Sequence, residues 1–172
     1  MINDFEISIS TVNELNPRIA GFIRRAYDRE FGDDSMVYAN PQWYVLGFLR
    51  DEPITQLGVL QRTITVNQNP LLIAGVSFLI TEPQYRGRGY ATAIMSEAIA
   101  FIEHKLSLPF GLLTCKPQLA SFYVRMGWKA IAEPNVFVQP TGNRSCGGVI
   151  MVNECGGSPW PEGKIDLCGL PW

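Results

Sequence analysis

The chain has 172 residues, of which 47% are hydrophobic and 17% are charged, and its formal net charge is −2. This length and composition are typical of one globular domain and exclude a disordered tail or a coiled coil. The small net charge does not indicate nucleic acid or an anionic membrane as a partner. No window approaches 18 uncharged apolar residues, and the first ten residues lack the pattern of a signal peptide. We therefore expect no membrane-spanning helix and a cytoplasmic location.

The cysteines and the single histidine indicate no metal site. Cys115, Cys146, Cys155 and Cys168 stand apart without CxxC spacing, and His104 has no second histidine to join it. The ligand set of a structural zinc site is therefore missing, and we expect reduced thiols and no metal. Cys115 is a candidate nucleophile, but we favour the alternative that it is a buried thiol.

The first half of the chain predicts one strand, one helix and three further strands. Residues 5–10 alternate between apolar and polar side chains, as a strand does. Asn16-Pro17 is typical of a helix start, and Gly32 is a plausible end. Residues 31–41 have no clear period and predict a loop or a short helical turn. The runs 42–51, 53–66 and 70–81 are rich in β-branched and aromatic residues, and turn signals separate them, so we expect a meander whose third strand is buried.

The second half predicts two helices and three strands. Apolar residues from Ala91 to Leu106 trace one face of a long helix, and residues 109–115 predict a strand. A short helix follows from Pro117 to Gly127. Residues 128–140, with a bend near Pro134, and 146–153 predict the last two strands. The order is strand, helix, three strands, helix, strand, helix and two strands, which is a mixed α/β (α+β) fold. Residues 158–172 have no clear period.

The turn between the third meander strand and the long helix has the features of a phosphate-binding site. Helix N-termini carry unpaired N–H groups and a partial positive charge. Gly87 and Gly89 leave those groups accessible, and Arg86 and Arg88 add cationic donors. The alternative is a basic turn that only links strand to helix. A P-loop is excluded because GxxxxGK[ST] is missing, and Thr92 replaces the third glycine of a dinucleotide site.

Residues Gln84-Tyr85-Arg86-Gly87-Arg88-Gly89 resemble the Q/R-x-x-G-x-G/A signature of the GNAT acetyltransferase superfamily, and the order of elements is similar to its fold. The resemblance implies one N-acyltransferase domain over residues 1–172, with acetyl-CoA as the acyl donor. It also implies a central sheet that is first antiparallel and then parallel. By position, the pyrophosphate would be bound by Arg86, Gly87, Arg88, Gly89, Tyr90 and Ala91. Backbone groups of Leu79 and Thr81 would hold the pantetheine.

A second segment resembles the part of the family that contains the catalytic acid. Phe122-Tyr123, followed by Met126-Gly127-Trp128, resembles the FYxKxGF stretch of the family. The resemblance implies that Tyr123 protonates the departing thiolate, since its phenol pKa of about 10 is near that of a thiol. The alternative is a core aromatic on an amphipathic helix. Lys116 and Leu119 stand where the family often has Asn and Ala.

The chain also resembles bacterial aminoglycoside 2'-N-acetyltransferases in its PTG stretch at 140–142 and its tail ending at Trp172. This resemblance implies that Asp33 or Asp34 and the Trp172 carboxylate bind a cationic acceptor, with 154–172 as an ordered tail near that site. The alternative for Asp33-Asp34 is a helix-terminating turn. Ser77 and Leu170 stand where those relatives have acidic residues.

Residues 160–166 resemble a tail segment of rhizobial nodulation acyltransferases, which move a fatty acyl chain onto a glucosamine oligomer. Both resemblances imply an amine of an amino sugar as acceptor and direct transfer in a ternary complex. Longer acyl donors, a protein or peptide amine as acceptor, and a non-catalytic CoA-binding module remain as alternatives. The base is open among Glu82, Asp33, Asp34, the Trp172 carboxylate and a water chain through Ser77. Many relatives are dimers, so a homodimer also stays open.

Overall fold

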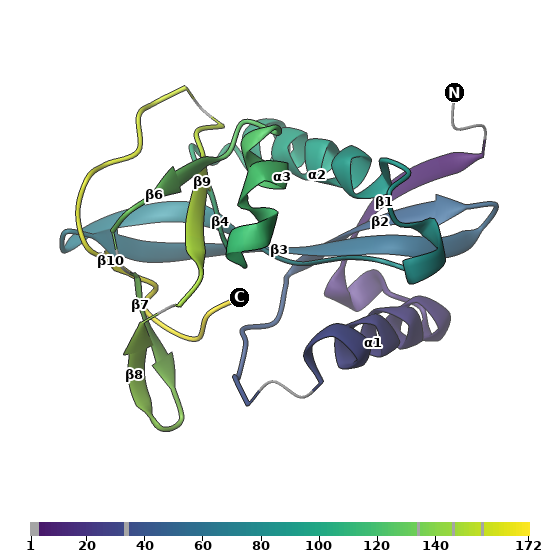
Figure 1. The fold of residues 1–172 in the computed structure, drawn as a ribbon, viewed down its shortest axis with the longest axis horizontal. Helices are drawn as coiled ribbons and strands as arrows, with labels where there is room; N and C mark the ends of the chain where they lie inside the picture. Colours follow the sequence, from purple (N-terminus) through teal and green to yellow (C-terminus); the bar gives the residue numbers. More distant parts are fainter. Residues whose placement is uncertain (1–3, 33–34, 134, 146, 156) are drawn as a thin grey trace.

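Two long antiparallel strands, β3 and β4, form the centre of the sheet, and helices cover both of its faces (Figure 1). The computed structural model describes residues 4–32, 35–133, 135–145, 147–155 and 157–172. Its strands are β1 (Phe5–Thr11), β2 (Trp43–Leu49), β3 (Glu52–Val66), β4 (Asn69–Thr81), β5 (Gly111–Cys115), β6 (Lys129–Ile131), β7 (Asn135–Gln139), β8 (Gly142–Ser145), β9 (Val149–Asn153) and β10 (Ile165–Asp166). Its α-helices are α1 (Pro17–Phe31), α2 (Tyr90–Ala100) and α3 (Ala120–Val124). Shorter helical segments are η1 (Val12–Glu14), η2 (Pro83–Tyr85), η4 (Pro117–Leu119) and the π-helical η3 (Phe101–Lys105), which extends α2.

The sheet is mixed, as predicted. Its order is β6-β9-β5-β4-β3-β10-β7-β8, and β2, which also carries β1, pairs with the first half of β3. β4 is antiparallel to β3 and parallel to β5, whereas β5 is antiparallel to β9. The order of strands and helices, with helices on both faces, confirms the predicted fold class.

The strand predicted over 128–140, with a bend near Pro134, is two separate strands. Residues 129–131 form β6, which pairs with β9, whereas 135–139 form β7, which pairs with β8 and β10. Pro134, which lies outside the described residues, separates the two in sequence, and proline lacks the N–H that an uninterrupted ladder needs. The two-residue strand β10 in the tail was not predicted, because its formation depends on partners in β3 and β7 that are distant in sequence.

The helices bury the faces that their sequences predict. Asn16 caps α1 by accepting a hydrogen bond from the Ile19 N–H at 3.0 Å, and Pro17 is the first helical residue, as expected. α1 packs Ile19, Phe22 and Ile23 against Leu46 of β2. α2 lies on the opposite face of the sheet (Figure 1). None of the helices within the described residues combines the length and apolar character needed to cross a membrane.

The last residue of the tail is seated on the centre of the sheet. The Trp172 side chain is 8% exposed, and its Nε1 donates a hydrogen bond to the Leu112 carbonyl of β5 at 3.1 Å. Its ring lies over Gly75 of β4, where a Cβ atom would come within 2.3 Å of the ring. The Arg62 guanidinium also lies over the Trp172 ring, 5.2 Å from its centroid. Glycine at 75 is therefore required by this close approach.

We expect Trp172→Ala to lower the free energy of unfolding by about 3–5 kcal/mol, the usual cost of truncating a buried Trp. Gly75→Ala should also destabilise the wild type, because its methyl group meets the Trp172 ring. In the Trp172→Ala background the same Gly75→Ala change should cost far less. Urea unfolding of the double-mutant cycle measures this coupling, with Leu72→Ala, 41% exposed on the same strand, as control. Additive effects of the two substitutions would contradict the packing.

Candidate active site

β4 and β5 separate soon after they meet, and this fork is the centre of the candidate site. Over the described residues they pair only at Ala74↔Gly111 and Gly75↔Leu112. Beyond Gly75, β4 continues to Thr81 paired with β3, and β5 continues to Cys115 paired with β9. The facing edges therefore diverge, and the edge of β4 offers backbone groups to an extended ligand, as an open strand edge does.

A β-bulge interrupts β4 inside the fork. The register against β3 shifts between Gln56 and Gly58, and Phe78 has a backbone φ of +51°. The Phe78 ring turns toward α1, with its centroid 5.2 Å from that of Tyr27, whereas Leu79 packs with the core under α2. Left-handed conformations are uncommon for bulky residues and cluster at functional sites. Sequence reasoning missed this residue, since no Gly or Asn marks position 78.

The predicted phosphate-binding turn has the expected local geometry. Gly87 and Gly89 have φ values of +74° and +86°, and Gly89 is the N-cap of α2, which begins at Tyr90. Gly89 provides no side-chain cap, and a Cβ at either glycine would meet no described atom within 4 Å. The N-terminus of α2 thus has no capping side chain, and no described atom crowds the two glycines, which suits the close approach of an anion. Arg88 lies beside the turn, its Cζ 5.9 Å from the Tyr85 ring centroid.

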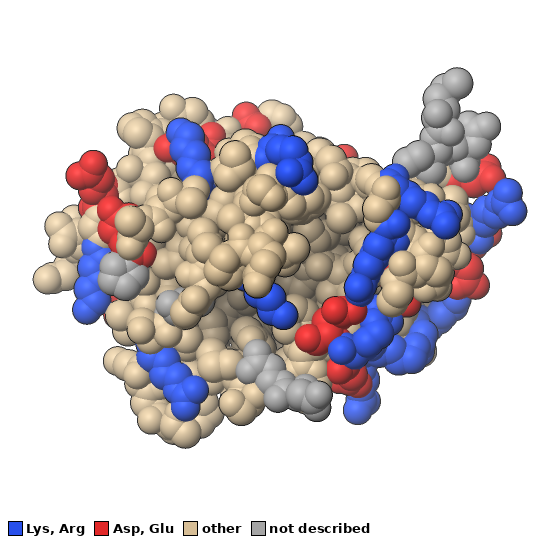
Figure 2. Space-filling model, viewed as in Figure 1, with Lys and Arg blue, Asp and Glu red and all other residues tan. Residues whose placement is uncertain are grey.

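Arg86 is held differently from Arg88. Its Nε donates a hydrogen bond to the Thr81 carbonyl at 3.0 Å, and its Nη2 pairs with Glu30 of α1. Arg29 in turn donates to both carboxylate oxygens of Glu82, at 3.0 and 3.1 Å. Burial would raise the pKa of Glu30, but hydrogen bonds from Arg29 and Arg86 outweigh it and hold that pKa below its usual range. Figure 2 shows basic and acidic side chains gathered over α1 and the turn that leads into α2.

Several residues named from the sequence have partners within the protein. The Thr81 carbonyl accepts a hydrogen bond from Arg86, and Arg86 also pairs with Glu30, so its guanidinium is anchored at the end of β4. Glu82, one candidate base, is engaged by Arg29. Ser77 is 8% exposed, and its Oγ has no hydrogen-bond partner among the described residues, so its hydroxyl has unused hydrogen-bonding capacity.

Tyr123 lies in α3 at the edge of the main core. It is 7% exposed, and its ring centroid lies 5.0 Å from that of Phe122 and 6.2 Å from that of Trp128. Burial raises the pKa of Tyr123 above its ordinary value, and the electrostatic effect of Cys115 adds to the rise. The phenol therefore stays protonated at neutral pH, which both a proton donor and a core aromatic require.

Of the three residues predicted to bind the acceptor, the structure describes Trp172. Asp33 and Asp34 lie outside the described residues. The Trp172 side chain lies at the point where β4 and β5 separate, because it covers Gly75 and bonds to Leu112. The tail also meets the loop before β2, since the Ala39 N–H donates to the Pro171 carbonyl at 2.7 Å. The role of the Trp172 carboxylate stays a prediction.

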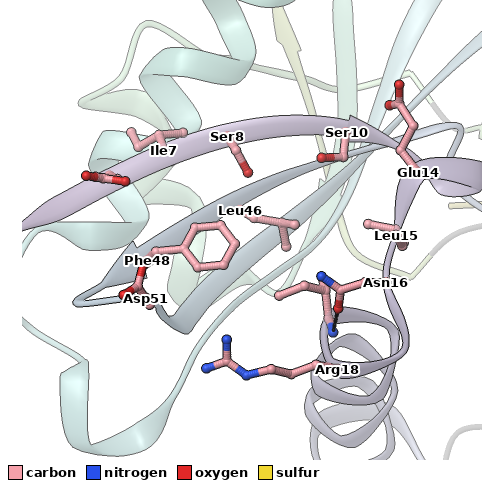
Figure 3. Close-up of a pocket in the computed structure, with 12 residues that line it drawn as sticks. Ile7, Ser8, Ser10, Glu14, Leu15, Asn16, Arg18, Leu46, Phe48 and Asp51 are labelled. Carbon is pink, nitrogen blue, oxygen red and sulfur yellow. Dashed lines mark hydrogen bonds between the residues drawn. The ribbon is translucent and has the colours of Figure 1, made fainter.

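Two hollows lie near α1. One, of about 380 Å³, lies between β1, the start of α1 and β2, and Figure 3 shows Leu46 and Phe48 between Ser8 of β1 and Arg18 of α1. Its lining includes no residue of β4 or α2, so it is remote from the fork. The second, of about 340 Å³, includes Gln56 of β3 and Phe78 of the bulge in its wall. No group of three His, Cys, Asp or Glu side chains that could hold a metal occurs in the described part of the chain.

The chain is similar in sequence to a curated nodulation protein. Nodulation protein A of Bradyrhizobium sp. (strain NC92) is 25% identical over 141 residues, which are 74% of this chain and 66% of that protein. The chain thus spans about two thirds of the length of this curated relative.

Two crystal structures share the fold. Escherichia coli ElaA has a TM-score of 0.66 at 16% identity, covering 87% of this chain and 99% of its own. A GNAT family acetyltransferase from Brucella melitensis in complex with acetyl-CoA has a TM-score of 0.62 at 12% identity, covering 93% of this chain and 94% of its own. Residues 14–131 match the profile of a family described as "Acetyltransferase (GNAT) domain". This match covers more than half of the chain and confirms the predicted family: the chain belongs to the GNAT family of acetyltransferases.

Proposed function

We propose that the protein is an N-acetyltransferase that moves the acetyl group of acetyl-CoA to a primary amine of a small molecule. The observation that carries the proposal is the fork between β4 and β5, which leads to a glycine turn at the uncapped N-terminus of α2. An elongated donor with a pyrophosphate at one end and a thioester at the other matches this arrangement. The acetyl-CoA complex of the Brucella melitensis relative supports the choice of donor.

The proposal gives each residue of the site a role. The pyrophosphate would meet the N–H groups of Tyr90 and Ala91 beyond Gly87 and Gly89, with Arg88 as a cationic donor. The pantetheine would follow the edge of β4 at Leu79 and Thr81. Arg86 would brace the turn through Thr81 and Glu30 while lying beside the phosphates.

Transfer would be direct. The neutral amine attacks the thioester carbonyl carbon, and an N–H of the β4 bulge polarises the carbonyl oxygen, as oxyanion holes do. The carbon–sulfur bond breaks, and Tyr123 donates to the departing sulfur. The proton lost by the amine passes through water to solvent, and a proton from solvent restores the Tyr123 phenol. Glu82 is the less suited base, because it is engaged by Arg29.

We further propose that residues 1–172 form one N-acyltransferase domain, that it acts in the cytoplasm, and that 154–172 lie beside the acceptor. The contact between Ala39 and Pro171 supports the place of the tail. A monoamino sugar is one acceptor within this function. An aminoglycoside, with Asp33, Asp34 and the Trp172 carboxylate as its anions, is the competing acceptor, and the two make opposite predictions for a polyamine. The alternative to acetyl-CoA is a longer acyl donor, and the similarity to nodulation protein A supports this alternative.

Purified protein should release CoA thiol from acetyl-CoA when a primary amine is supplied. A panel of aminoglycosides with and without a 2'-amine, monoamino sugars and aryl alkylamines tests the acceptor. Parallel assays with octanoyl- and palmitoyl-CoA test the donor. Turnover with acetyl-CoA and any amine supports the proposed reaction. Acetyl-CoA binding without amine-dependent release would contradict it and favour a binding module.

Arg88→Ala should raise the KM for acetyl-CoA about tenfold or more, because a charge-assisted contact to the pyrophosphate is lost. The kcat at saturating acetyl-CoA should change little, since Arg88 is remote from the reacting carbonyl. Arg50→Ala is the matched control, because that exposed arginine pairs only with Asp4 among the described residues. An unchanged KM in the Arg88 variant would remove this residue from the donor site.

Tyr123→Phe should lower kcat about 100-fold, the lower range of general acid catalysis, while the KM values change little. Because the Tyr123 pKa is raised, the phenol is protonated throughout neutral and mildly alkaline pH and deprotonates only as pH rises past that elevated pKa. The wild-type rate should therefore rise with pH as the amine deprotonates and should not fall before about pH 10. A descending limb centred at or below about pH 10, the ordinary pKa of a phenol, that disappears in Tyr123→Phe would show an unshifted acid and contradict this account.

A further inference from the structure

The hollow beside the bulge has an aromatic wall. It has a volume of about 340 Å³ and lies between α1, the loop at 38–41 and strands β2 to β4. The rings of Tyr27, Tyr38, Tyr44 and Phe78 line it. Tyr27 and Tyr38 both pack edge-on against Phe78, with centroid distances of 5.2 and 5.5 Å. Such a wall suits a ligand that contains a ring, because aromatic side chains pack against other aromatic rings and against the C–H faces of sugars.

A single amide is buried in this wall. Gln56 of β3 is 1% exposed and lines the hollow, and its Oε1 has no hydrogen-bond partner among the described residues. Native structures rarely leave such an oxygen unsatisfied, because a buried acceptor without a donor is costly. Ser77, beside the bulge, carries a second unpartnered oxygen, 3.1 Å from where a Cβ at Gly58 would lie. A ligand with an N–H donor would satisfy the Gln56 oxygen.

The bulge residue connects this hollow to the fork. The Phe78 ring lines the hollow, whereas its backbone belongs to the β4 edge that faces the divergence from β5. An amine bound at Gln56 and a thioester bound along β4 would therefore meet beside Phe78. This is the arrangement that direct transfer needs.

The charges around the hollow disfavour a polycation. Of its described lining residues none is acidic, and the one charged side chain is Arg24, which is largely exposed and lies 3.8 Å from Asp28. The other titratable groups in the lining are Tyr27, Tyr38 and Tyr44, and burial raises the pKa of Tyr44. An environment that disfavours ions lowers the pKa of a bound amine, which supplies the neutral nucleophile without a carboxylate base.

We propose that this hollow is the acceptor pocket, that it takes a primary monoamine on an uncharged, ring-bearing body, and that the amine donates a hydrogen bond to Gln56 Oε1. The proposal rests on the N-acetyltransferase function proposed above. It makes Gln56 a residue that determines specificity. A carboxylate at this position would instead favour a charged ammonium group.

The test compares Gln56→Leu, which removes the oxygen, with Gln56→Glu, which adds a charge at similar volume. Gln61→Leu, a half-exposed position of the same strand outside the hollow, is the matched control. The acceptors are 2-phenylethylamine, glucosamine and the polyamine kanamycin, and the first two distinguish an aryl body from a sugar body. The readouts are kcat/KM for each amine, its dependence on pH, and the KM for acetyl-CoA.

The wild type should prefer at least one monoamine over kanamycin by about tenfold or more, since the hollow offers kanamycin no described counter-charge. Gln56→Leu should lower kcat/KM for that monoamine about tenfold and leave the KM for acetyl-CoA unchanged. Gln56→Glu should shift the rate profile to higher pH and reduce the preference over kanamycin. A purely structural role of Gln56 would produce neither change.

Preference for kanamycin in the wild type, or equal rates in Gln56→Leu and Gln61→Leu, would overturn the proposal. If no amine is turned over, the proposed function fails. The acceptor pocket is then tested separately, by calorimetric measurement of monoamine binding in the presence of CoA. Monoamine binding that weakens about tenfold in Gln56→Leu would still support it. An absence of monoamine binding to the wild type would overturn it.

Discussion

The brief pairing of β4 with β5 is the constraint on which the rest of the site depends. Two residue pairs join the strands, and the Trp172 ring sits on Gly75 while bonding to Leu112, so one side chain touches both strands at the fork. β3 and β9 then hold the diverging strands from outside. The opening is thus part of the sheet rather than a gap between loops, which gives a ligand fixed backbone groups to bind.

The proposed donor site and the proposed acceptor pocket share structural supports. Arg86 joins the glycine turn to the end of β4 and to Glu30, and Arg29 joins Glu82 to the same end of α1. Partly exposed ion pairs contribute little stability one at a time, but here four charges form one network. α1 also supplies Tyr27, whose ring packs on Phe78 of the bulge. The helix next to the proposed acceptor pocket is therefore tied to the turn proposed for the donor phosphates.

The sequence predicted those parts of the site that depend on local chemistry. The cap at Asn16 and the helix that begins after the glycine turn follow from residue types at fixed spacing, and the structure confirms both. The bulge at Phe78 has no such signal, because an aromatic residue does not indicate a left-handed backbone and the conformation depends on packing against α1. The partners of Arg86 and Trp172 are distant in sequence and could not be predicted for the same reason. The division of 128–140 into two strands likewise depends on which neighbour each half meets.

The most direct test of this account is amide hydrogen exchange with and without acetyl-CoA. The central claim is that the donor lies along the open edge of β4 and meets the N-terminus of α2. We expect saturating acetyl-CoA to slow exchange in Val76–Thr81 and in Gly87–Thr92, and to leave β1 and the hollow of Figure 3 unchanged. Protection confined to β1, β2 and the start of α1, or no protection in β4, would contradict the account.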